Sequence, residues 1–276
     1  MNLLDALPHL TSRIEAYDAA GRQSIGTGFF FGFRIDNDNS FIALITNKHV
    51  LHGAKNAIIN VSRMKDGQPS FGEYNKWTIE GVDKNIVGHP DPAIDIAGFP
   101  VGSILNQMVD AGQPPFFQHL QAENIPSDKA IQSLSAVEDI LMIGYPTGVW
   151  DSTHNIPIIR RGITATPYAR DYEGRPEFMI DCACFPGSSG SPVIIASQGS
   201  YPMKDGGIAM GTRLFLLGLL WGGPQYTAEG EIVARPAPTS VVPVSISRIP
   251  TNLGFCLKAH LILDLFPLFK IKYHLR

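Results

Sequence analysis

Residues 185–193 read Phe-Pro-Gly-Ser-Ser-Gly-Ser-Pro-Val, a turn in which two glycines bracket a serine. Gly187 and Gly190 lack a Cβ, so the backbone there can adopt positive φ and approach a substrate closely. In such a turn the amides of Gly187 and Ser189 would point at one substrate carbonyl oxygen and stabilise an oxyanion. An ordinary Gly/Ser turn between two strands fits the same residues. The turn alone therefore makes Ser189 a candidate nucleophile and leaves the choice to the rest of the chain.

A serine hydroxyl becomes a good nucleophile at neutral pH when a histidine base lies beside it and a carboxylate orients that base. An apolar run begins at Phe41 and ends in a polar corner that carries His49. Asp95 lies inside a second apolar run, residues 92–99, where an unpaired carboxylate would be costly. We therefore predict that Asp95 has a hydrogen-bonding partner and that this partner is His49.

Three short motifs follow one another in the chain: Thr-Asn-Lys-His-Val at residues 46–50, Asp-Ile-Ala at 95–97 and Gly-Ser-Ser-Gly-Ser-Pro at 187–192. In this order the chain resembles the trypsin/chymotrypsin-like serine peptidases, and the residues of its three motifs are most similar to those of the bacterial HtrA-type branch. The resemblance extends from about Gly26 to Phe266. It implies two barrels with the active site between them, His49 and Asp95 coming from the first and Ser189 from the second.

The composition is that of a soluble globular protein. Of 276 residues, 44% are hydrophobic and 17% are charged, and the net charge of −3 indicates no nucleic-acid or membrane partner. The 27 glycines and 21 prolines, with many short apolar runs between turns, favour an all-β fold. Residues 1–17 fit neither a signal peptide nor a membrane span, and no later segment has about 18 consecutive apolar residues. We therefore expect a cytoplasmic protein.

Together with the resemblance, these patterns predict two six-stranded antiparallel β-barrels of the chymotrypsin type, a short N-terminal helix or arm and a C-terminal helix. The N-terminal helix is expected to begin at Thr11 or Ser12, and a late strand of the second barrel at residues 240–247. Apolar positions in residues 253–266 share a helical face, which predicts a helix that Pro267 would end. This segment resembles the closing helix of the family, and the resemblance implies that it packs on the second barrel. The expected divisions are the N-terminal helix or arm, 1–23, the first barrel, 24–101, an interdomain connection, 102–135, the second barrel, 136–252, and the C-terminal helix and tail, 253–276.

The resemblance also places the substrate-binding residues. By family position, Ala183 lies at the base of the pocket for the side chain before the scissile bond, and Cys184 adds a soft apolar wall. The segment Leu219-Leu220-Trp221-Gly222-Gly223 resembles the edge that pairs with the substrate backbone and lines the pocket, with Leu220, Trp221 and Gly222 as the expected substrate-binding residues. Because Ala183 supplies no counter-charge for a basic side chain, we expect cleavage after small or medium apolar residues.

The three cysteines, Cys182, Cys184 and Cys256, are too few and odd in number for the disulfide framework of secreted members. We expect them to be reduced and partly buried, and a thiol nucleophile at Cys184 is the functional alternative. His52 follows His49 by three positions, but the sequence offers no convincing third metal ligand. We therefore predict neither a metal nor an organic cofactor.

The predicted function is that of a serine endopeptidase that works through an acyl-enzyme. His49 would act as base, Asp95 would orient it, and the amides of Gly187 and Ser189 would bind the oxyanion. Ser188 stands where the digestive members carry an aspartate that pairs with a newly cut N-terminus, so zymogen cleavage is not expected. The partners would be a protein or peptide substrate and, if specificity alone does not protect the cell, a protein activator. The alternative is a non-catalytic or latent module that keeps the peptidase fold and binds protein.

Overall fold

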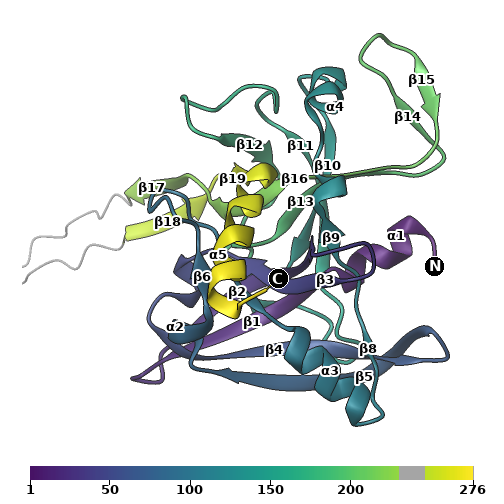
Figure 1. Cartoon of the computed structure of the whole chain (residues 1–276). Helices are drawn as coiled ribbons and strands as arrows, with labels where there is room; N and C mark the ends of the chain where they lie inside the picture. Colours follow the sequence, from purple (N-terminus) through teal and green to yellow (C-terminus); the bar gives the residue numbers. More distant parts are fainter. Residues whose placement is uncertain (230–245, 276) are drawn as a thin grey trace, which may run out of the picture.

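The computed structural model describes residues 1–229 and 246–275, and most of its regular structure is β. A large open sheet and a closed barrel lie against each other, the sheet below and the barrel above in Figure 1. The sheet takes its strands from residues 11–121 and the barrel from residues 139–258. The expected β fold in two successive halves is therefore confirmed, but only the second half is closed.

The open sheet has nine strands in the order β5-β4-β1-β2-β3-β7-β6, with β8 paired to β4 and β9 paired to β2. These strands are β1 (Thr11–Asp18), β2 (Gln23–Arg34), β3 (Ser40–Thr46), β4 (Ala54–Lys65), β5 (Gln68–Glu80), β6 (Val87–Gly88), β7 (Ala97–Pro100), β8 (Pro115–Phe116) and β9 (Leu120–Gln121). The predicted first six-stranded barrel is wrong. Closing it would need β5 to pair with β6, but β6 has two residues and the short helix α2 (Val82–Asn85) separates it from β5.

A short helix at the N-terminus is confirmed, but its expected start at Thr11 or Ser12 is wrong. Helix α1 (Leu3–Ala6) and the 3-10 turn η1 (Leu7–His9) come earlier, and Thr11 begins β1, which lies between β2 and β4. The buried hydroxyl of Ser12 donates to the carbonyl oxygen of Asn60 at 2.9 Å and accepts its N–H at 3.0 Å. Ser12 thus satisfies a neighbouring strand and does not cap a helix.

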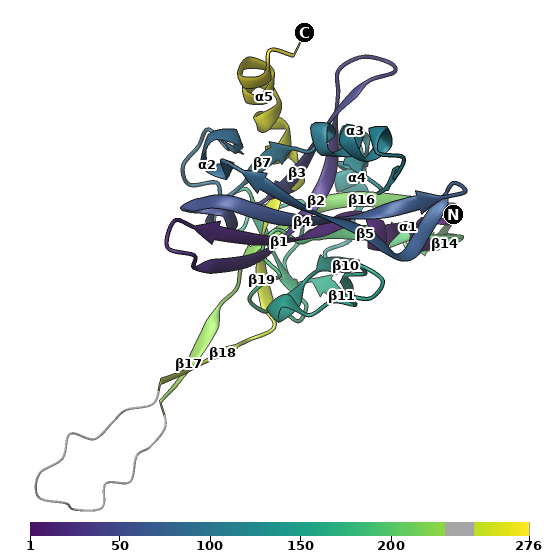
Figure 2. The ribbon, with the colours of Figure 1, turned by 90° about the horizontal axis from the view of Figure 1, so that it is seen from below.

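The closed barrel has six strands in the order β10-β11-β12-β19-β16-β13, which confirms the prediction for the second half. They are β10 (Asp139–Gly144), β11 (Ile158–Thr164), β12 (Glu177–Asp181), β13 (Pro192–Ser197), β16 (Arg213–Gly222) and β19 (Leu253–Lys258). Two hairpins project from it, β14 (Ser200–Pro202) with β15 (Ile208–Met210) and β17 (Gln225–Glu229) with β18 (Ile246–Pro250) (Figures 1 and 2). The strand expected at residues 240–247 lies almost wholly outside the described residues.

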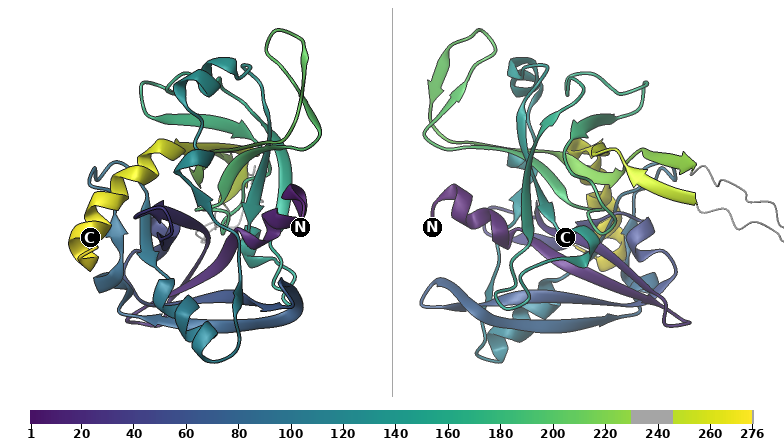
Figure 3. Two further views of the ribbon diagram at one scale, coloured as in Figure 1. Left: turned by 45° about the vertical axis from the view of Figure 1, so that its right-hand side comes forward. Right: turned by 180° about the vertical axis from the view of Figure 1, so that it is seen from behind.

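The C-terminal helix begins later than expected and packs on a different surface. Residues 253–258 form β19, which pairs with β12 and β16 and so completes the barrel. The 3-10 turn η5 (Ala259–Asp264) and helix α5 (Leu265–Tyr273) follow, and Pro267 lies in the first turn of α5, where its missing N–H costs nothing. Phe269 packs against Phe33 and Phe41 of the open sheet, so α5 spans from the barrel to the sheet (Figure 3).

The segment between the two halves contributes to the open sheet. Helix α3 (Gly102–Asp110) buries Ile104, Leu105 and Met108 in the apolar cluster of that sheet, and β8 and β9 add short pairings to it. The 3-10 turn η3 (Ala122–Asn124) and helix α4 (Asp128–Ser133) then lead to the barrel. Among the described residues, no helix has both the length and the apolar character required to cross a membrane.

Candidate active site

His49 and Asp95 form a hydrogen-bonded pair. His49 begins the 3-10 turn η2 (His49–Leu51) shortly after β3, and Asp95 lies in the loop before β7. Asp95 Oδ2 is 2.5 Å from His49 Nδ1, and Asp95 Oδ1 accepts the backbone N–H of His49 at 3.1 Å. A carboxylate at Nδ1 favours the tautomer with its hydrogen there, which leaves Nε2 as an acceptor. The His49 side chain is 48% exposed, so a substrate can reach it.

The loop that carries Ser189, residues 185–191, is anchored to the open sheet at Thr27. The N–H of Thr27 donates to the carbonyl oxygen of Ser189 at 2.8 Å, and the Thr27 hydroxyl donates to that of Gly187 at 3.0 Å. The carbonyl oxygen of Thr27 accepts from the hydroxyl of Thr46 at 2.7 Å. Thr46 ends β3, three residues before His49. The serine loop and the end of β3, which leads to the histidine turn, therefore both bind this one residue of β2.

Two glycines allow the serine loop to come this close. Gly187 has φ of +86° and Gly190 has φ of +85°, which side chains of L-residues rarely permit. A Cβ at Gly190 would overlap the carbonyl oxygen of Thr27, and a Cβ at Gly187 would lie 2.5 Å from the carbonyl oxygen of Tyr145. Both glycines are thus required by conformation and by space, as the sequence pattern indicated.

The amides of Gly187 and Ser189 are available to a ligand. The carbonyl oxygen of Pro186 accepts the N–H of Thr147 at 2.5 Å, and the N–H and C=O of a trans peptide point in opposite directions. The N–H of Gly187 therefore points away from Thr147. Within residues 1–229 and 246–275, neither this N–H nor that of Ser189 donates to a protein acceptor. Two unsatisfied amides beside one serine hydroxyl can stabilise a carbonyl oxygen that becomes negative.

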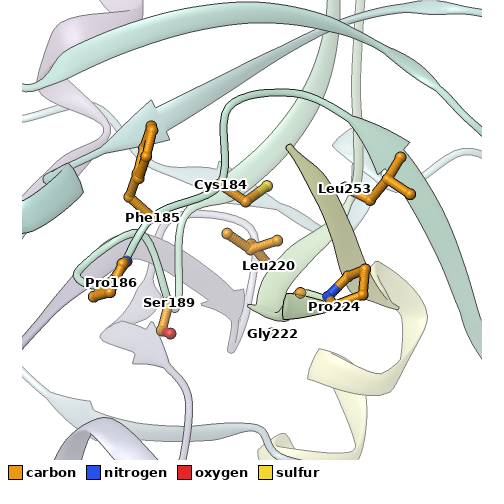
Figure 4. A pocket seen from close by; sticks show the side chains of 9 residues that line it. Cys184, Phe185, Pro186, Ser189, Leu220, Gly222, Pro224 and Leu253 are labelled. Carbon is orange, nitrogen blue, oxygen red and sulfur yellow. The ribbon is translucent and has the colours of Figure 1, made fainter. Parts of the chain in front are cut away.

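A small apolar pocket of about 140 Å³ opens beside Ser189 (Figure 4). In Figure 4 the side chains of Cys184 and Leu220 lie between Phe185 and Leu253, with Ser189 at one side. The residues that line it carry no charged side chain and are Cys184, Phe185, Pro186, Ser189, Leu220, Gly222, Gly223, Pro224 and Leu253. The pocket therefore suits an uncharged group of modest size next to the serine hydroxyl.

The three cysteines are free, buried and poor nucleophiles. Burial raises the pKa of the Cys184 thiol to about 12 and also raises the pKa values of Cys182 and Cys256. Since the thiolate is the reactive form, these side chains stay unreactive at neutral pH. This favours Ser189 over Cys184 as the nucleophile. Across the part of the chain that the structure describes, no three His, Cys, Asp or Glu side chains are grouped to hold a metal.

Only some of the residues predicted to bind the substrate side chain line the pocket. The lining includes Cys184, Leu220, Gly222 and Gly223, but not Ala183, Leu219 or Trp221. The Trp221 ring stacks on Phe255 at 5.9 Å between centroids. Four lining residues were not predicted from the sequence: Phe185 and Pro186 next to the serine motif, and Pro224 and Leu253 further along. The first two could have been found from their place beside Ser189, but only tertiary structure brings Leu253 to the site.

The family of this chain is shown by its similarity to known proteins. The trypsin-like peptidase domain matches residues 26–201, and no curated protein matches the chain. The active form of the Rv3671c protease from M. tuberculosis is 16% identical, with a TM-score of 0.46 over 96% of this chain and 82% of that chain. The HtrA-type protease AlgW with tripeptide is 16% identical, with a TM-score of 0.49 over 98% of this chain and 62% of that chain.

The serine endoprotease from Yersinia pestis is 15% identical, with a TM-score of 0.47 over 97% of this chain and 66% of that chain. The domain match spans more than half of the chain and includes the His49, Asp95 and Ser189 motifs. The chain belongs to the family of trypsin-like peptidase domains.

Proposed function

We propose that this protein is a serine endopeptidase in which His49, Asp95 and Ser189 form the catalytic triad. The observation that carries the proposal is the contact between His49 and Asp95. It is supported by Thr27, which binds the serine loop and also accepts from Thr46 at the end of β3. A peptidase-fold module that only binds protein would need neither an oriented imidazole nor two unsatisfied amides beside a serine. The arrangement therefore supports catalysis over binding alone.

The mechanism is acyl transfer to water. His49 Nε2 takes the proton of the Ser189 hydroxyl as its oxygen attacks the scissile carbonyl carbon, and Asp95 stabilises the imidazolium that forms. The amides of Gly187 and Ser189 donate to the oxyanion of the tetrahedral intermediate. His49 then gives the proton to the leaving amine. In the second half of the reaction His49 takes a proton from water, which attacks the acyl carbonyl carbon, and returns that proton to the Ser189 oxygen as the acid leaves. Each step uses groups already on the described residues.

The pocket supports a preference for small or medium apolar side chains before the scissile bond. Its volume is about 140 Å³ and its lining residues are uncharged. In addition, the guanidinium carbon of Arg160 lies 5.3 Å from the centroid of the ring of Phe185, one of the lining residues. A basic substrate side chain would thus find a cation nearby and no counter-charge, and it would lose its hydration on entry. Narrow specificity follows from this small volume.

The preference is tested with fluorogenic peptides that differ only in the residue before the scissile bond. We expect kcat/KM to be highest for Ala, Val or Leu and at least about 10-fold lower for Arg, because an unpaired buried charge costs more than a lost methylene. The same peptides with the Ser189→Ala protein measure any contaminating peptidase. Fastest cleavage after Arg would show that the pocket has been assigned wrongly.

A further inference from the structure

The loop that carries Asp95, residues 89–96, is closed at its base by His89. The N–H of His89 donates to the carbonyl oxygen of Ile96 at 2.8 Å, and the N–H of Asp91 donates to Nδ1 of His89 at 3.1 Å. Lys48 Nζ donates to the carbonyl oxygen of Asp91 at 2.9 Å and so ties this aspartate loop to the histidine turn. His89 thus binds both ends of the loop that carries Asp95, through its backbone N–H and its ring.

The ring of His89 is held by Asp264. Its Nε2 lies 3.1 Å from Asp264 Oδ2, and its side chain is 5% exposed. Because Nδ1 accepts the N–H of Asp91, the hydrogen of the neutral ring resides on Nε2 and is donated to the carboxylate of Asp264. Asp264 thus fixes for His89 the tautomer in which Nδ1 can accept, just as Asp95 fixes the tautomer of His49.

Helix α5, which follows Asp264 directly, donates hydrogen bonds to the backbone just before the aspartate loop. Lys272 Nζ donates to the carbonyl oxygen of Ile86 at 2.8 Å, and the Tyr273 hydroxyl donates to that of Asn85 at 2.6 Å. The left view of Figure 3 shows α5 running from the barrel down to the sheet. The C-terminal segment therefore holds residues 85–91 at three points, one of which is His89.

We propose that His89, fixed by Asp264 at the start of α5, is a positioning residue for Asp95, so that the C-terminal segment sets the geometry of the catalytic pair. The proposal rests on the proposed peptidase function for its kinetic consequences, but its structural content is separate. In addition to closing the barrel, the C-terminal segment would influence the His49–Asp95 hydrogen bond through its contact with the aspartate loop.

Two substitutions at His89 separate its two hydrogen bonds. His89→Asn keeps an acceptor oxygen at the place of Nδ1, whereas His89→Gln keeps a donor near the place of Nε2 and loses that acceptor. We expect kcat per active site, counted by titration with a fluorophosphonate, to fall about 10- to 100-fold in His89→Gln, the effect of a misplaced catalytic group. KM should change little. His89→Asn should recover only part of the loss, because it restores the acceptor for the N–H of Asp91 but not the contact with Asp264.

The matched control is His154→Gln, because His154 forms an exposed pair with Asp151 at 2.8 Å and lies outside the aspartate loop. If His89→Gln does not fold, Asp264→Ala replaces it, since Asp264 is 55% exposed. Loss of titratable sites with unchanged kcat per remaining site would overturn the proposal, because it would show a structural role alone. Equal effects of His89→Gln and His154→Gln would overturn it as well.

A readout that needs no turnover separates this proposal from the function on which it rests. The hydrogen on His49 Nδ1, bonded to the Asp95 carboxylate, should give a low-field proton resonance that His49→Ala lacks. We expect this resonance to shift or broaden in His89→Gln and to stay unchanged in His154→Gln. An unchanged resonance in His89→Gln contradicts the positioning role even if the wild type cleaves no peptide. Absence of wild-type activity with a shifted resonance contradicts the peptidase proposal alone.

Discussion

Ser189→Ala is expected to reduce peptide hydrolysis by about 10⁴- to 10⁶-fold, because it removes the atom that attacks the carbonyl carbon while the rest of the site remains. The change deletes one oxygen at the edge of the pocket, so folding should be preserved. Initial rates on the best peptide substrate, with thermal unfolding recorded in parallel, measure both effects.

Ser191→Ala provides the comparison within the same loop. The hydroxyl of the buried Ser191 donates to Thr27 Oγ1 at 3.2 Å, so its loss should lower the free energy of unfolding by about 1 kcal/mol. The nucleophile stays in place, and the loss of turnover should be far smaller than in Ser189→Ala. If the two variants lose turnover equally, anchoring of the loop and not the Ser189 hydroxyl limits the reaction.

Asp95→Asn is expected to lower kcat by about 10⁴-fold without a comparable loss of stability. Asparagine has the shape of aspartate, but its side-chain amide can donate to Nδ1 of His49. That contact favours the tautomer with hydrogen on Nε2, which cannot accept the proton of Ser189. The imidazolium would also lose the carboxylate that now lies 2.5 Å from Nδ1.

Asp139→Asn is the control for Asp95→Asn, because Asp139 is an exposed residue of β10 that pairs with Arg161 on the surface. Rates at several pH values, normalised to titrated active sites, distinguish a wrong tautomer from a reduced amount of folded enzyme. Retention of most of the wild-type kcat in Asp95→Asn would mean that the contact with His49 is structural.

The candidate triad could be predicted from the sequence because its chemistry needs particular residue types. Asp95 lies in an apolar run and needed a partner, and the structure supplies His49. The positive φ of Gly187 and Gly190 was likewise implied by the glycines of the turn. Such local requirements can be read without knowing what lies opposite each residue in the fold.

Where pairing across the chain decides the structure, the sequence was less informative. Thr11 and Ser12 look like helix caps, but Ser12 is buried against Asn60 of β4, which lies far away in the sequence. Residues 253–257 have no polar side chain because β19 completes the barrel, and Leu257 has the same spacing to the apolar residues 261, 262 and 265 as on a helical face. Helix and buried strand cannot be separated by periodicity over such short runs.

The residues around the site could not be predicted either, because they come from segments far apart in the sequence. No pattern around Thr27 indicates that it anchors the serine loop, and nothing near Leu253 indicates that it lines the pocket. The contact between His89 and Asp264 joins residues 175 positions apart. Each of these features depends on contacts between segments that are far apart in the sequence.

The most direct test of the triad is the reaction of the purified protein with a fluorophosphonate, followed by mass spectrometry of the intact chain and its peptides. A competent triad should take up one equivalent on Ser189, and both Ser189→Ala and His49→Ala should remain unlabelled under the same conditions. A folded wild type that takes up no label, or labelling that persists in Ser189→Ala, would contradict the assignment of Ser189 as an activated nucleophile.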